Sequence, residues 1–141
     1  MTNRFKTMSV LVLAGTLTAA GLALAGCSGP GDDVDLGGRA FTATEVRGHK
    51  IVDGSSIVVT FEEGNVSVNA GCNTQFGPVK WDEQKLEVDG VLASTMMACD
   101  EALMAQDQWL AEFLMSTPAL ALDGDTLTLG DDTTGMTLVE E

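Results

Sequence analysis

The chain has 141 residues, of which 21 are acidic and only seven are basic, so its formal net charge is −14. This length suits one domain with a single hydrophobic core and is short for two domains. An excess of carboxylates of this size repels the phosphates of nucleic acids and the anionic headgroups of lipids. We therefore expect no nucleic-acid partner.

The N-terminal segment has the pattern of a bacterial export signal. Arg4 and Lys6 precede an uncharged run over residues 8–26, which gives a positive n-region followed by an apolar h-region. Because the run approaches the roughly 20 residues that a membrane-spanning helix needs, a retained transmembrane anchor is the competing interpretation. Interspersed Gly and Thr residues, small residues at the end of the run and the lack of a following basic cluster favour cleavage. Residues 1–26 are thus a predicted signal peptide.

The signal ends in a motif that predicts lipid attachment. Leu24-Ala25-Gly26-Cys27 resembles the lipobox of bacterial lipoproteins, in which the cysteine receives a diacylglycerol and becomes the new N-terminus. A thiolate is the best side-chain nucleophile for taking up a lipid group, and two or three acyl chains make membrane binding stable. We expect an exported protein that is anchored through Cys27 to the membrane, on its outer face or its periplasmic side.

A flexible tether is expected to join the lipid to the folded domain. Residues 28–38 are rich in Gly, Pro and Asp, and such a segment buries too little apolar surface to fold. The tether is therefore predicted at residues 27–38 and the domain at residues 39–141. Cleavage leaves five basic residues against 21 acidic ones, so the mature chain carries a net charge of −16.

The remaining cysteines predict a disulfide. With Cys27 acylated, Cys72 and Cys99 form an even pair in an oxidising compartment, where a bond between them is the default expectation. A structural zinc site is the alternative, but the chain has no Cys-x-x-Cys motif and His49 is its only histidine. Because ligands for zinc are scarce, we expect the disulfide, no metal site and no cofactor.

The region from Ala40 onward has the pattern of short strands separated by turn residues. The expected strands lie at residues 40–46, 56–62, 65–70, 79–81, 86–88, 119–122, 126–129 and 136–139. A helix is expected from about Asp100 to Met115, because apolar residues recur there at helical spacing and Pro118 follows. The predicted fold class is α+β: a small antiparallel, barrel-like sheet of about seven or eight strands with one amphipathic helix.

Two short motifs in this region carry a family resemblance. Gly71-Cys72-Asn73 stands at the end of a predicted strand, and Thr95-Met96-Met97-Ala98-Cys99 stands directly before the helix. Together with Gly77 and the hairpin at residues 124–129, they resemble the META domain, a family that includes HslJ-like proteins of the bacterial envelope. The resemblance covers roughly residues 39–139. It implies a helix packed across antiparallel strands, an envelope location and a link to stress tolerance, but no settled biochemical activity.

Asn73 and Thr95 are the candidate ligand-contacting residues, although both can instead satisfy loop backbone. No catalytic residues are predicted: His49 stands in no nucleophile motif, and we interpret it as a surface histidine. The leading hypothesis is a membrane-tethered, non-enzymatic binding or stabilising module, with an envelope protein as candidate partner. The alternative is a divalent-cation binder or a weak carboxylate-based envelope enzyme, which the acidic composition motivates.

Overall fold

The computed structural model describes residues 34–141. The predicted signal peptide, Cys27 and the first part of the expected tether lie outside the described residues. Within residues 34–141, no helix is long and apolar enough to cross a membrane.

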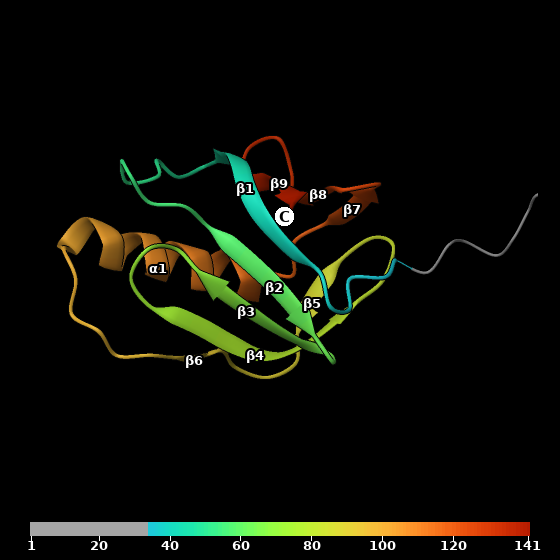
Figure 1. Cartoon of the computed structure of the whole chain (residues 1–141), viewed down its shortest axis with the longest axis horizontal. Coiled ribbons are helices and arrows are strands. Elements are labelled where there is room, and N and C mark those ends of the chain that lie inside the picture. The colour runs from blue at the N-terminus through green and yellow to red at the C-terminus, as the bar shows by residue number, and fades with distance from the viewer. Residues whose placement is uncertain (1–33) are drawn as a thin grey trace, which may run out of the picture.

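Nine strands and one helix follow each other along this part of the chain (Figure 1). They are β1 (Ala40–Arg47), β2 (Val58–Glu62), β3 (Asn65–Asn69), β4 (Thr74–Trp81), β5 (Leu86–Val88), β6 (Ala93–Ser94), α1 (Glu101–Met115), β7 (Leu120–Asp123), β8 (Thr126–Gly130) and β9 (Gly135–Glu140). The sheet has the order β5-β4-β3-β2-β1-β9-β8-β7, and β6 pairs with β4 beside this path. All of these strand pairs are antiparallel.

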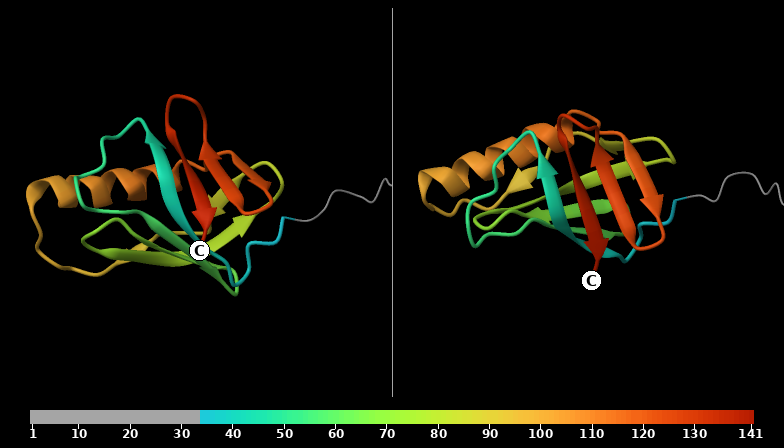
Figure 2. Two further views of the ribbon diagram at one scale, coloured as in Figure 1. Left: turned by 45° about the horizontal axis from the view of Figure 1, so that its top comes forward. Right: turned by 90° about the horizontal axis from the view of Figure 1, so that it is seen from above.

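The sheet curls so that its two ends meet. An antiparallel bridge joins Lys85, just before β5, to Ala119, just before β7. The helix α1 runs across the strands and covers the interior of the curved sheet (Figure 2). This arrangement confirms the expected α+β fold with a barrel-like antiparallel sheet and one helix packed across it.

The core follows from the alternation of side chains along the strands. Val59 and Phe61 on β2, and Val66 and Val68 on β3, point inward and are almost completely buried, as the period of two in a strand requires. Leu110, among other residues of α1, packs against the same cluster. The helix therefore owes its position to the apolar stripe that faces the sheet.

Two parts of the sheet were not predicted. The strand β4 begins at Thr74, whereas the sequence pattern predicts only its last three residues, and β6 was not expected at all. In the first half of β4 the inward positions are Gln75 and Gly77, and the outward ones include the exposed Phe76. A strand with a polar residue and a glycine on its inner face carries no apolar alternation, so the pattern conceals it.

The predicted end of the tether is wrong by about five residues. Leu36 is completely buried and Val34 packs against the core. The indole nitrogen of Trp81 donates a hydrogen bond to the carbonyl of Val34 at 2.7 Å, and the amide of Gly38 donates to the carbonyl of Phe61. Two apolar side chains and two hydrogen bonds are enough to hold this acidic segment against the sheet, so residues 34–38 belong to the domain.

An ion pair joins the beginning of β1 to the end of β9. The guanidinium of Arg39 donates to both carboxylate oxygens of Glu140, at 3.0 and 2.6 Å, and lies over the ring of Phe41. The hydrogen bond to Glu140 raises the pKa of Arg39, and the same bond lowers the pKa of Glu140. This pair fixes the point where the chain enters the sheet to the point where it leaves.

The buried position of Leu36 gives a stability prediction. Truncation by Leu36→Ala should lower the free energy of unfolding by about 3 kcal/mol, because it removes buried methyl groups and leaves a cavity. Chemical denaturation of the variant measures this change. The exposed Val91 offers a control: Val91→Ala should change stability by less than about 0.5 kcal/mol. Equal, small effects of both substitutions would mean that residues 34–38 do not contribute to the core.

Candidate functional site

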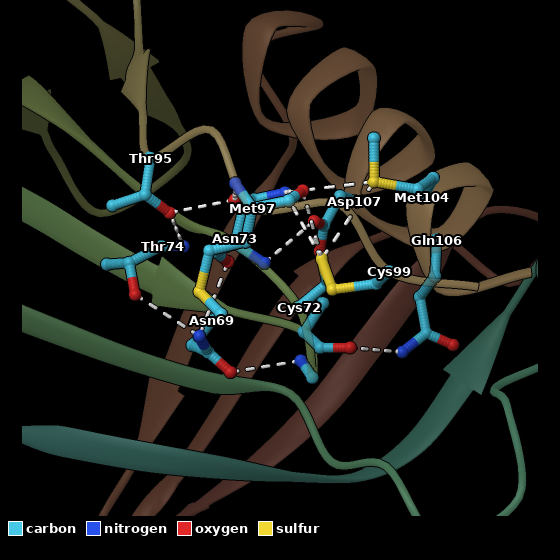
Figure 3. Close-up of a disulfide and its surroundings, with 12 residues drawn as sticks. Asn69, Cys72, Asn73, Thr74, Thr95, Met97, Cys99, Met104, Gln106 and Asp107 are labelled. Carbon is cyan, nitrogen blue, oxygen red and sulfur yellow. Dashed lines mark hydrogen bonds between the residues drawn. A yellow bond between two sulfur atoms is a disulfide. The ribbon is translucent and has the colours of Figure 1, made fainter. Parts of the chain in front are cut away.

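A disulfide joins the turn after β3 to the connection before α1 (Figure 3). The sulfur atoms of Cys72 and Cys99 are bonded, and their Cα atoms lie 6.1 Å apart. Cys72 belongs to the turn between β3 and β4, and Cys99 lies two residues before α1. The expected disulfide is therefore confirmed, and neither thiol is free to bind zinc. Among residues 34–141, no group of three or more His, Cys, Asp or Glu side chains is placed to hold a metal ion.

The turn at Gly71 is possible because this residue has no side chain. Its φ angle is +103°, and a Cβ atom here would lie 2.9 Å from the Cβ of Ser55 and 3.1 Å from a methyl carbon of Leu103. A glycine tolerates both a positive φ and a close approach of other atoms, and the structure shows both at this position. The turn brings Cys72 and Asn73 directly beneath the N-terminal half of α1.

Asn73 joins three segments of the chain. Its backbone amide donates to the carboxylate Oδ2 of Asp107 on α1 at 2.8 Å. Its side-chain oxygen accepts hydrogen bonds from the hydroxyl of Thr95 at 2.9 Å and from the backbone amide of Met97 at 2.7 Å, and its side-chain nitrogen donates to the carbonyl of Met97. The Asn73 side chain thus fixes the connection between β6 and α1.

Thr95 contacts Asn73, and its hydroxyl stabilises the same connection between β6 and α1. Besides donating to Asn73, its oxygen accepts a hydrogen bond from the backbone amide of Thr74 at 3.0 Å. The two candidate residues therefore lie together, and the hydrogen bonds of their side chains are made to the protein itself. This favours the structural role over direct ligand contact through these groups.

The helix also places a buried glutamine in the interior. Gln106 is completely buried. Its oxygen accepts from the amide of Val52 at 2.7 Å, and its nitrogen donates to the hydroxyl of Ser55 and to the carbonyl of Ala70. Val52 and Ser55 lie in the loop between β1 and β2, and Ala70 directly follows β3, so Gln106 holds α1 to both places without leaving its own polar atoms unpaired.

Asp107 and Gln75 are different, because each keeps an oxygen without a partner. Asp107 is 6% exposed and Gln75 is 4% exposed. The side-chain nitrogen of Gln75 donates to the backbone carbonyl of Asp107 at 2.6 Å. However, Oε1 of Gln75 and Oδ1 of Asp107 have no hydrogen-bond partner. A buried polar atom that loses its partner costs roughly 1–3 kcal/mol, so these two oxygens call for a donor from outside the protein.

A groove of about 750 Å³ opens above these two residues, between α1 on one side and β4, β6 and the following connection on the other. Its walls are Asn73, Gln75, Leu92, Ser94, Thr95, Met96, Met97, Ala98, Glu101, Met104, Ala105, Asp107, Gln108 and Ala111. A hollow of about 550 Å³ lies at the polar turn beside Trp81, but neither of the unpartnered oxygens belongs to its walls. The groove is therefore the candidate site.

Sequence reasoning missed the two residues at the centre of this site. Asp107 is four residues after Leu103 and three before Leu110, so its helical phase places it on the inward stripe, and this spacing is the signal that could have found it. Gln75 lies in the half of β4 that was not predicted. His49, which was expected at the surface, is half-buried and stacks on Trp109, with ring centroids 4.9 Å apart.

The disulfide gives a prediction about stability. Cys72→Ser and Cys99→Ser should each lower the free energy of unfolding by about 3 kcal/mol, and the double variant should lose no more than either single variant, because all three lack the same bond. Denaturant unfolding measures the three losses, and reduced wild-type protein is the control with the same bond missing. Additive losses would show that the two cysteines stabilise the domain separately.

Comparison with known proteins agrees with this architecture. One solved structure, determined by NMR, is 26% identical, covers 74% of this chain and 90% of its own, and has a TM-score of 0.60. An NMR structure of a protein from Burkholderia xenovorans is 18% identical, covers 75% of this chain and 83% of its own, and has a TM-score of 0.59, which shows the shared fold alone. No curated protein matches the chain. The family model described as the META domain matches residues 34–141, and the chain therefore belongs to the META domain family.

Proposed function

We propose that this protein is a lipid-anchored, non-enzymatic binding module of the bacterial envelope, and that the groove between α1 and β4 is its binding site. The observation that carries the proposal is that Gln75 and Asp107, two residues in the walls of the groove, each keep a buried side-chain oxygen without a hydrogen-bond partner. Native proteins pair nearly all of their buried polar groups. A ligand that supplies donors at this place completes the pairing.

The frame of the groove supports a binding role because its two walls are held in place before any ligand arrives. The Cys72–Cys99 bond, the side chain of Asn73 and the side chain of Gln106 all attach the strand ends to α1 or to the connection that precedes it. A site that is already ordered loses little conformational entropy on binding. A mainly apolar hollow with a few fixed polar groups is the usual form of a ligand pocket.

The hydroxyl groups of the groove support binding in preference to catalysis. A nucleophilic hydroxyl needs a base that accepts its proton. The hydroxyl of Thr95 donates to the side-chain oxygen of Asn73, and that of Ser94 donates to the backbone carbonyl of Thr95. An amide oxygen and a peptide carbonyl are too weakly basic for this task, so the proposed function is non-enzymatic.

The anchor would hold the groove close to the membrane. The folded domain begins no later than Val34, so seven peptide units separate it from Cys27 and span at most about 25 Å. The negative net charge of the chain would be repelled by anionic headgroups. The domain would then stand beside the membrane surface and be able to receive ligands that are dissolved in the envelope.

The anchor can be tested through Cys27. When cells are supplied with radioactive palmitate, the wild-type protein should become labelled, lose residues 1–26 and sediment with membranes. Cys27→Ser should remain unlabelled and keep its N-terminal segment. The double variant Cys72→Ser, Cys99→Ser is the matched control and should still be labelled. Incorporation of label into Cys27→Ser would show that Cys27 is not the lipidated residue.

The groove can be tested by photo-crosslinking in living cells. A photoreactive amino acid at position 97 places the probe in the groove, where Met97 is 61% exposed. At position 139 it replaces Val139, which is 39% exposed on β9 and is not part of the groove. Mass spectrometry should find a reproducible adduct from position 97 and none from position 139. Identical adducts from both positions, or none from either, would contradict a binding site in the groove.

A further inference from the structure

We propose that the ligand of the groove is a small amphipathic amine, in which a protonated primary amino group is carried on an apolar body. This inference rests on the proposed function of the groove as a binding site and names the chemistry of what it binds. The amino group would lie between the side-chain oxygens of Gln75 and Asp107. The apolar body would lie along the methionine side chains at the mouth of the groove.

The two unpartnered oxygens decide the chemistry of the ligand's head. Oε1 of Gln75 and Oδ1 of Asp107 are both acceptors, because an amide oxygen and a carboxylate oxygen carry no proton to donate. A ligand carboxylate or phosphate would bring further acceptors and leave all of them unpaired. A primary ammonium brings three donors and no acceptor, which matches this floor. A quaternary ammonium has the charge but no N–H donor.

The charge of the groove favours a cation. Glu101 and Asp107 are the charged residues of its walls, and no basic residue is present among the described residues that line it. The hydrogen bond that an ammonium donates to a carboxylate is charge-assisted and stronger than one between neutral groups. The negative net charge of the whole chain would also concentrate cations near the site.

The walls favour an apolar body behind the amino group. Met96, Met97 and Met104 are 95%, 61% and 42% exposed and line the same groove as Leu92. Methionine side chains are flexible and polarizable, so they adapt their packing to ligands of different shape. An alkyl or aromatic body laid across them would cover apolar surface that is open to water. The volume of about 750 Å³ lies within the range of ordinary small-molecule sites.

The test compares four probes of the same chain length. The protein is the mature chain from residue 27 with Cys27→Ser, so that no lipid competes for the groove. Calorimetry measures its affinity for hexylamine, hexanol, hexanoate and hexyltrimethylammonium, and NMR spectra of the labelled protein identify the amides that shift. Hexylamine should bind at least roughly tenfold more tightly than each of the others, as the loss of a charge-assisted hydrogen bond predicts, and should shift the amides of Asn73 and Met104.

Equal binding of hexanol would make the site merely apolar, and equal binding of hexyltrimethylammonium would make it merely electrostatic. Either result overturns the inference, as does the absence of hexylamine binding, which would leave the two oxygens to an ordered water molecule.

Two charge-removing variants locate the amino group. Asp107→Asn keeps an oxygen that can accept from the amide of Asn73 but replaces the free acceptor by an N–H donor, so the affinity for hexylamine should fall at least roughly tenfold. Asp132→Asn makes the same change at an exposed carboxylate between β8 and β9, outside the groove, and the affinity should stay within about twofold because solvent and salt screen a distant surface charge. Equal losses in both variants would overturn the assignment. If Asp107→Asn unfolds the domain, Gln75→Met removes the other acceptor at similar length, and the same loss is expected in a variant whose thermal midpoint is first shown to be that of a folded protein.

Failure of the amine proposal can be distinguished from failure of the groove proposal by comparing the hexylamine titration with the photo-crosslinking experiment. A specific adduct from position 97 together with no hexylamine binding would overturn the amine and leave the groove as a site for another ligand. No adduct and no hexylamine binding would overturn both proposals.

Discussion

The hydrogen bonds of Asn73 are the constraint on which the arrangement of the helix and its preceding connection depends. One residue holds the Asp107 carboxylate through its backbone amide and both peptide groups of Met97 through its side chain. The neighbouring disulfide joins the same two segments covalently. Because the residues between β6 and α1 form no regular structure of their own, these side-chain contacts replace the backbone ladder that a strand would provide. The helix is thereby fixed in its N-terminal half, where its buried residues are the polar Gln106 and Asp107.

The other half of α1 is held by ordinary packing. Leu110, Phe113 and Leu114 are buried in the main core, where the sheet closes through the bridge between Lys85 and Ala119. The helix thus has two kinds of support along its length: polar and covalent near the disulfide, apolar near its C-terminus. The groove lies beside the polar half. The polar residues Asn73, Thr95 and Asp107 in its walls are consequently oriented by hydrogen bonds.

Much of this fold could be predicted because its determinants are local. The alternation in β2, β3, β8 and β9, and the helical spacing that ends near Pro118, are visible within short windows of sequence, and the even cysteine pair gave the disulfide. The misses share a physical cause. Gln75 and Asp107 are polar residues at inward positions, where only a partner that is distant in sequence makes burial tolerable. Val34 and Leu36 are two apolar residues in an acidic segment, and their burial depends on the distant Trp81 and Phe61.

Only part of the candidate site could therefore be predicted from the sequence. Asn73 and Thr95 could be found because they stand in motifs of a recognisable family, and they proved to be the frame of the groove. The residues at its floor belong to no motif and follow only from geometry. Gln106 beside them shows that this polar layer can be satisfied completely, since its nitrogen and its oxygen are both paired. Because Gln106 is fully paired, the missing partners of Gln75 and Asp107 are a local feature of these two residues and do not extend to the whole interface between helix and sheet.

The burial of the Asp107 carboxylate also supports a binding role for the groove. An apolar side chain at position 107 would avoid the desolvation of a carboxylate, and such replacements of buried charges are often neutral or stabilising. One hydrogen bond, from the amide of Asn73, offsets only part of the free-energy cost of burying this carboxylate when its second oxygen stays unpaired. Local rules of stability are broken in natural proteins mainly where function requires it. A buried acceptor that the protein leaves open, next to a groove that it does not fill, is better explained by something that binds there than by the demands of folding.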